Sequence, residues 1–160
     1  MRERNDEMLQ LVNVAFADVR LGGGVSLRET LVVDNHGTTE QRLLARRADE
    51  TLDWHRVVSD PELTRLAYIG GIAFYDPEGM RFHLPAYLSL AITRFEERGA
   101  GNVLEVLMNT LTRSTIQTDE RFSLLNQAQR RCISEVLSYL RATYELESPK
   151  LDAAVLSWQR

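Results

Sequence analysis

Three histidines are the residues of this sequence with the most direct claim to chemistry. His36 follows Asp34 and His55 follows Asp53, so the chain carries two Asp-x-His pairs, and His83 stands apart from both. A carboxylate beside an imidazole can orient a general base or support a metal ligand. No His-x-x-x-His pair is present, so a metal site would need three distant segments to converge. We therefore expect no catalytic, cofactor or metal site. A small enzyme or metal-binding protein that uses these histidines and nearby acids is the alternative.

The remaining residues that could react also have simpler explanations. Cys132 is the only cysteine, so no internal disulfide can form, which fits a reducing compartment. It falls beside the apolar stripe of a predicted helix, where a free cysteine behaves as a small hydrophobe. The triple glycine at 22–24 is not followed by the Lys-Ser/Thr pair of a phosphate loop. No Gly-x-Ser-x-Gly nucleophile motif is present.

Residues 74–87 read F-Y-D-P-E-G-M-R-F-H-L-P-A-Y and predict a β-hairpin near residues 71–84. Apolar and polar residues alternate on both sides of Asp-Pro-Glu-Gly, which has the composition of a β-turn. On that hairpin Tyr75, Arg81 and His83 would share the exposed face, and these types together make a plausible protein-recognition patch. The alternative is structural: Tyr75 and Arg81 form a stabilising cross-strand pair, and His83 only contacts the next helix.

The rest of the chain predicts helices, which must position that hairpin. Apolar residues recur at three- and four-residue spacing in residues 8–19, 84–95, 103–111, 123–144 and 151–158. Ser26 and Glu29 have the spacing of a capping box, Pro85 is expected to open a helix and Asn102 to cap the next one. The segment 38–58 predicts one or two exposed helices. The predicted fold class is mostly α, with a minor β component from one short antiparallel hairpin, in a single domain spanning residues 1–160.

Composition and charge restrict the possible partners. With 44% hydrophobic and 26% charged residues the chain resembles an ordinary soluble protein, and no apolar run approaches the roughly 20 residues of a membrane span. The N-terminus lacks the basic-then-apolar pattern of a secretory signal. A net charge of -4 makes nucleic acid an unlikely partner, because nucleic-acid binding needs basic patches. We therefore expect a cytoplasmic protein that binds neither membrane nor nucleic acid.

The run from Ile72 to Tyr87 resembles a bacterial family of unknown function. Its members read F-x-D/S-P-x-G-x-R-(F/Y)-(Y/H)-L-P-A-(Y/F), and the similarity extends more loosely to Arg46–Trp54 upstream and to a pattern from Phe122 to Leu137 downstream. The resemblance implies no active site. Some relatives lie beside secreted-toxin genes, as cytoplasmic immunity proteins do.

The sequence thus predicts a non-enzymatic, cytoplasmic protein-binding module, in its most concrete form an immunity-type inhibitor whose acidic surface occludes the basic site of a toxin. Its recognition residues would be Tyr75, Arg81 and His83. A homo-oligomeric structural or regulatory domain is a further alternative, with the face formed by Leu151, Val155 and Trp158 used for association. The oligomeric state is left open.

Overall fold

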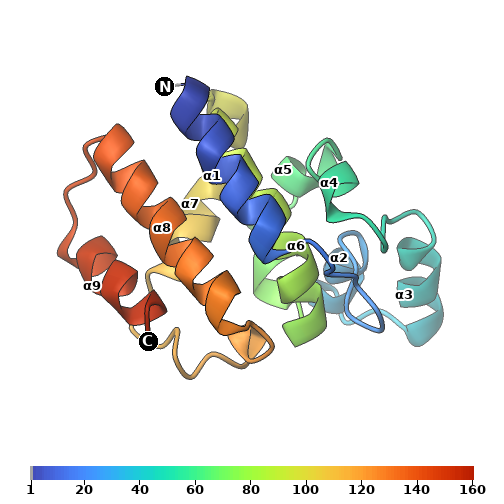
Figure 1. Ribbon diagram of the computed structural model, residues 1–160. Coiled ribbons are helices and arrows are strands. Elements are labelled where there is room, and N and C mark those ends of the chain that lie inside the picture. The colour runs from blue at the N-terminus through green and yellow to red at the C-terminus, as the bar shows by residue number, and fades with distance from the viewer. Residues whose placement is uncertain (1) are drawn as a thin grey trace.

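Helices make up all of the regular structure in residues 2–160, the part of the chain that the computed structural model describes. Within this range there are nine α-helices and no strand. The α-helices are α1 (Arg2–Ala15), α2 (Glu29–Asp34), α3 (Thr39–Arg46), α4 (Trp54–Val57), α5 (Glu62–Arg65), α6 (Pro77–Arg94), α7 (Gly101–Leu111), α8 (Gln127–Thr143) and α9 (Pro149–Trp158) (Figure 1). Short 3-10 helices occur at η1 (Gly71–Phe74), η2 (Arg98–Ala100) and η3 (Glu120–Phe122).

The prediction of a β-hairpin near residues 71–84, and with it the minor β component of the fold class, is wrong. The first predicted strand is η1, and the predicted turn is the beginning of α6. Asp76 is the N-cap of that helix, and its carboxylate accepts a hydrogen bond from the backbone N–H of Gly79 at 2.8 Å. Pro77 follows at the first helical position, where its missing N–H leaves no bond unmade. Asp-Pro-Glu-Gly therefore starts a helix here.

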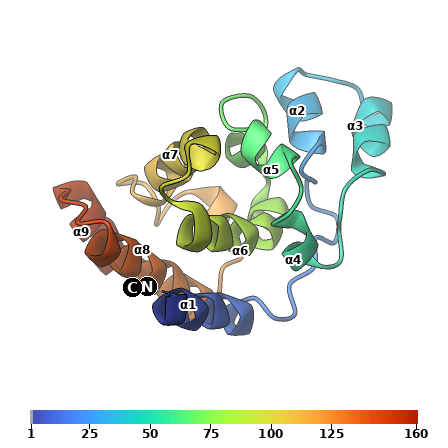
Figure 2. The same cartoon turned by 90° about the horizontal axis from the view of Figure 1, so that it is seen from above.

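Helix α6 lies at the centre of the molecule. Figure 2 shows it between α1 and α8 on one side and α7 on the other, and contacts join it to all three. Every residue from Phe82 to Ile92 is buried, which is the pattern of a helix enclosed on all sides. Pro85, expected to open a helix, instead lies inside α6, where its carbonyl accepts a hydrogen bond from the Ser89 hydroxyl at 2.8 Å.

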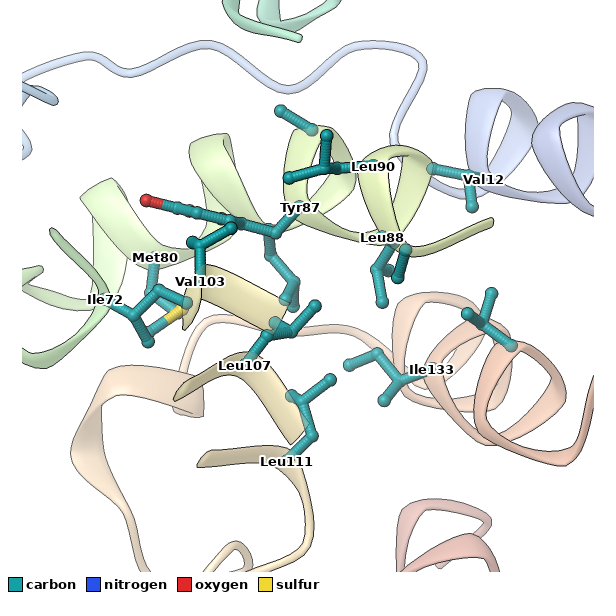
Figure 3. Close-up of a cluster of buried hydrophobic side chains, with 14 of the residues drawn as sticks. Val12, Ile72, Met80, Tyr87, Leu88, Leu90, Val103, Leu107, Leu111 and Ile133 are labelled. Carbon is teal, nitrogen blue, oxygen red and sulfur yellow. The ribbon is translucent and has the colours of Figure 1, made fainter. Parts of the chain in front are cut away.

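The hydrophobic core extends outward from α6. Figure 3 shows Leu88 of α6 close to Leu107 of α7 and Ile133 of α8, and Val12 of α1 at the edge of the same cluster. All four side chains are no more than 1% exposed. Burial of a large aliphatic side chain stabilises the fold by about 1.5–3 kcal/mol, so these helix contacts hold the central layer in place.

The C-terminal helices were predicted more closely. Helix α8 occupies residues 127–143 of the predicted 123–144, and α9 packs against it. Within the face proposed for self-association, Leu151 and Trp158 are buried inside the fold, and the indole N–H of Trp158 donates to the carbonyl of Leu111 at 2.8 Å. That face is therefore an internal contact between α9 and its neighbours.

Two predicted helix starts differ from the structure. Glu29 does accept a hydrogen bond from the Ser26 N–H at 2.9 Å, but the Ser26 hydroxyl donates to Asp49 at 2.6 Å instead of capping a helix, and α2 begins only at Glu29. Asn102 lies inside α7, which begins at Gly101. The first difference arises because Asp49, distant in sequence, binds the Ser26 hydroxyl; the start of α7 has no side-chain cap from the described residues.

Candidate functional site

The structure separates the three predicted recognition residues. Tyr75 and His83 are 3% and 0% exposed, and their rings stack inside the molecule with centroids 4.3 Å apart. Arg81 is only partly buried. It lies two residues from His83 on α6, and neighbours two apart on a helix do not share a face. The predicted patch therefore resolves into an internal aromatic pair and one arginine near the surface.

The aromatic pair has no route to a partner protein. The Nδ1 atom of His83 lies 2.7 Å from the carbonyl oxygen of Gly79, so Nδ1 carries the proton, because a carbonyl can only accept. Burial lowers the pKa of His83 to about 4, so the ring is neutral at physiological pH. The hydroxyls of Tyr75 and Tyr87 lie 3.2 Å apart, and burial raises the pKa of both phenols. These groups hold the beginning of α6 in position.

Arg81 lines a cleft of about 470 Å³ where the end of α1, the beginning of α6 and the beginning of α8 meet (Figure 1). We call it the Arg81 cleft. Three sets of residues line it: Leu11, Val14 and Ala15 of α1, with Ala17, Asp18, Val19 and Arg20 of the following turn; Arg81 of α6; and Asn126, Ala128 and Gln129 around the start of α8. The cleft is thus built by segments that are far apart in sequence.

The charge of Arg81 is not satisfied by the fold. Its Nε atom is buried without a hydrogen-bond partner, and no carboxylate within residues 2–160 lies within 4.0 Å of its guanidinium, Asp18 of the cleft included. Other partly buried arginines have partners: Arg121 pairs with Asp119 at 2.6 Å and Arg46 with Glu29 at 3.5 Å. Among residues 2–160, Arg130 forms no ion pair and has a buried Nη1 without a partner, but its Nη2 donates to the carbonyl of Phe122 at 3.0 Å. A buried charge is costly unless it is paired. The Arg81 guanidinium makes no hydrogen bond to the described residues, so it is available to a partner from outside the chain.

The beginning of α8 adds hydrogen-bond donors to the cleft. Asn126 and Gln129 form a capping box, in which each side-chain oxygen accepts the backbone N–H of the other residue, at 2.9 and 3.1 Å. Because the oxygens face the backbone, the amide N–H groups of both side chains remain for a ligand. The N-terminus of this 17-residue helix also favours negative charge. Guanidinium, amide donors and helix end together suit a carboxylate.

Apolar surface surrounds these donors. Leu11, Val14 and Ala15 of α1 line the cleft, and Val14 is 67% exposed. An arginine beside apolar side chains in a cleft is a common anchor of protein–protein contacts. The cleft can thus hold an acidic side chain whose neighbours in the partner are apolar.

The structure does not bring the histidines together. His36 lies in the turn after α2, His55 is exposed on α4, and His83 is inside α6. Of the two Asp-x-His pairs, only Asp53–His55 forms, with 2.7 Å between Oδ1 and Nδ1; this hydrogen bond is the main cause of a lowered pKa for Asp53. No group of three metal-ligating side chains is found among residues 2–160.

Cys132 is buried on α8, as the sequence predicted, and burial raises the pKa of its thiol to about 12. A thiol with such a pKa is not a nucleophile at neutral pH.

A polar network that the sequence did not predict joins the loop before α2 to the segment after α3. Arg28 donates to Asp49 and to Asp60, and the carboxylate of Asp49, only 1% exposed, also accepts from the hydroxyl of Ser26. No local pattern pointed to these contacts, because the partners are more than 20 residues apart. The Ser26–Glu29 spacing was the only signal in this region.

The family model described as "Family of unknown function (DUF6714)" matches residues 4–159. The chain belongs to this family. No curated protein and no solved structure matches the chain. The family description assigns no chemistry, so DUF6714 membership adds no site residue to those that the geometry identifies, and the whole Arg81 cleft lies within the matched range. None of the described helices is long and apolar enough to cross a membrane.

Proposed function

We propose that this chain is a non-enzymatic, cytoplasmic protein-binding module and that the Arg81 cleft is its recognition site. The observation that carries the proposal is the buried Nε of Arg81, which has no partner within the described part of the chain. A partner that places an Asp or Glu side chain in the cleft would supply two parallel N–H···O bonds to the guanidinium. The apolar rim at Val14 would then exclude water from this ion pair.

The net charge of -4 indicates what surrounds that acidic group in the partner. An acidic protein associates fastest with a basic surface, so the partner presents one carboxylate within otherwise basic surroundings. In its most concrete form the module is an immunity-type inhibitor that occludes a basic toxin site. This form is supported by the similarity of residues 72–87 to sequences beside secreted-toxin genes, together with the acidic charge.

The family signature suggested by the sequence fits this assignment. In Asp-Pro-x-Gly-x-Arg, Asp76, Pro77 and Gly79 form the start of α6, and Arg81 follows in the first turns. We propose that the signature serves to fix the position of this arginine at the cleft.

The test is affinity capture from the native host with three forms of the chain: wild type, Arg81→Gln, and Arg131→Gln as the control. Arg131 is exposed on α8 and forms no ion pair among residues 2–160, so its replacement removes the same charge elsewhere. We expect a protein that is captured by wild type and by the control, and is lost with Arg81→Gln. Calorimetry with the purified partner should then show that Arg81→Gln loses about 2 kcal/mol or more of binding free energy.

Two results would overturn the proposal. One is a partner that binds Arg81→Gln as tightly as wild type, and the other is the recovery of no partner by any form. Circular dichroism of the variants checks that both keep the helical fold.

A further inference from the structure

A second cavity lies between α9 and the segment that follows α7. It has a volume of about 560 Å³, within the range of small-molecule sites, and shares no lining residue with the Arg81 cleft. One wall is the face of α9 from Lys150 to Ser157, with Arg160 just beyond the end of the helix, and the other includes Thr112, Arg113 and Ser114. We call it the α7–α9 pocket. It belongs to a part of the fold that the proposed function does not use.

The pocket concentrates positive charge in an acidic protein. Arg113, Lys150 and Arg160 all line it, and no Asp or Glu does so among the described residues. None of these three cations forms an ion pair within residues 2–160. Lys150 is also the only lysine of the chain. Three free cations around one cavity, in a chain of net charge -4, point to an anionic ligand.

The acids closest in sequence are occupied elsewhere. Asp119 pairs with Arg121 at 2.6 Å, and Asp152 pairs with Arg141 of α8 at 2.9 Å. Glu147 is the exception: it lines an adjoining hollow that shares Thr112 and Lys150 with the pocket, without forming an ion pair. The positive charge of the pocket therefore stays largely uncompensated.

Hydrogen bonds hold the two walls together before any ligand binds. The side-chain amide of Gln117 donates to the Ser157 hydroxyl at 3.1 Å and to the Ser157 carbonyl. The indole of Trp158 donates to the carbonyl of Leu111 at 2.8 Å, which ties the end of α9 to the end of α7. A preformed cavity loses little entropy on binding.

The hydroxyl and apolar groups of the pocket define the ligand further. The Ser157 hydroxyl accepts from Gln117, so its own proton is free to donate, and Ser114 makes no hydrogen bond to the described residues. Ile116 and Ala154, 1% and 3% exposed, form an apolar floor. We propose that the α7–α9 pocket binds a small organic phosphate, with the phosphate between Arg113 and Lys150 and the organic group against Ile116 and Ala154. Arg160 and the two serines supply additional donors.

The proposal is tested with phenyl phosphate as the probe, inorganic phosphate and phenol as partial ligands, and calorimetry with ¹H–¹⁵N NMR as the readouts. We expect saturable binding of phenyl phosphate, shifts at the amides of Ser114 and Ser157, and weaker binding of either partial ligand. Lys150→Met should weaken binding about tenfold, the loss of one charge-assisted hydrogen bond. Glu147→Gln should tighten it, and Arg131→Gln should leave it unchanged.

Three outcomes would overturn the proposal: no saturable change at millimolar phenyl phosphate, equal binding by Lys150→Met and wild type, or shifts centred on the Arg81 cleft. A single-stranded oligonucleotide could instead bind more tightly than phenyl phosphate, with an affinity that falls with salt as expected when several phosphates are neutralised. The surface would then be a nucleic-acid site. Because the variants lie outside the Arg81 cleft, failure here leaves the proposed protein-binding function untouched.

Discussion

The imidazole of His83 stacks on the phenol ring of Tyr75, with 4.3 Å between the ring centroids and 15° between the planes. Its Nδ1–H is held by the carbonyl of Gly79, and its Nε2 is buried without a partner. The neutral ring is accommodated here, whereas a second proton on Nε2 would place an unpaired charge in the core. This contact makes the beginning of α6 sensitive to acid.

We expect His83→Gln to reduce the dependence of stability on pH. Burial lowers the pKa of His83 from 6.5 to about 4, so as the pH falls the unfolded chain takes up the proton before the folded chain does. The contribution of the neutral His83 ring to the free energy of unfolding is complete above pH 6.5. It is lost as the pH falls from 6.5 to about 4, and it changes no further below that. The loss is about 3 kcal/mol. Urea unfolding at a series of pH values measures it.

The control for this experiment is His36→Asn, because His36 is exposed and Asn tolerates its positive φ of 54°. This variant should keep the pH profile of the wild type. A His83→Gln curve parallel to the wild-type curve between pH 4 and 6.5 would contradict the assigned pKa.

Replacement of Asp76 by alanine should lower the free energy of unfolding by about 2–4 kcal/mol. One oxygen of its carboxylate accepts both the N–H of Gly79 at 2.8 Å and the N–H of Val25 at 2.9 Å. The helix cap accounts for about 1 kcal/mol. The unsatisfied N–H of buried Val25 adds about 1–3 kcal/mol. Asp76→Asn retains an acceptor oxygen and should lose less than about 1 kcal/mol. Equal losses in the two variants would mean that the charge matters and not the acceptor.

Asp76 also shows why the hairpin was predicted and why it is absent. Asp-Pro-Glu-Gly suits a β-turn and a helix N-terminus equally well, and the choice between them depends on what surrounds the residues. Met80, Phe82 and Leu84 read as an alternating strand because the beginning of α6 shows no clear helical period, and only residues 84–95 were recognised as helical. Helices α1 and α8, each with one polar face, were recognised by that period.

The candidate site was predictable only in part. The sequence singled out Arg81 because of its unusual neighbours, but the cleft depends on the meeting of α1, α6 and α8, which no local pattern encodes. Tyr75 and His83 were grouped with it through a strand geometry in which alternate residues share a face. On α6 that spacing places Arg81 and His83 on different faces, while Tyr75 lies before the helix and stacks on His83.

Arg81→Met should leave the free energy of unfolding unchanged or raise it by about 1 kcal/mol, because it removes a partly buried charge whose Nε has no partner among the described residues while keeping the approximate length of the side chain. An arginine retained for binding is expected to behave in this way. Chemical denaturation of the variant against wild type provides the measurement. A loss above about 2 kcal/mol would show that Arg81 stabilises the fold.

The pair Arg28–Asp49 should show strong energetic coupling in a double-mutant cycle. The guanidinium of Arg28 donates to Asp49 at 2.8 Å and to Asp60 at 2.6 Å, and its backbone N–H also donates to Asp49. Asp49 is 1% exposed, so Arg28→Ala leaves a buried carboxylate with fewer donors and should cost about 3 kcal/mol. Asp49→Ala leaves Arg28 with Asp60 and should cost about 2–3 kcal/mol.

The double variant should lose about 1–3 kcal/mol less than the sum of the two single variants, because each single change already removes the contact. The exposed pair Arg141–Asp152, at 51% and 49% side-chain exposure, is the matched control and should show a coupling below about 1 kcal/mol. Urea unfolding of all seven proteins, with the wild type as the parent of both cycles, gives both coupling energies under one condition. If the buried pair coupled no more strongly than the exposed one, the network would be held by its backbone hydrogen bonds, and Ser26 and the Arg28 backbone N–H would be the groups to test next.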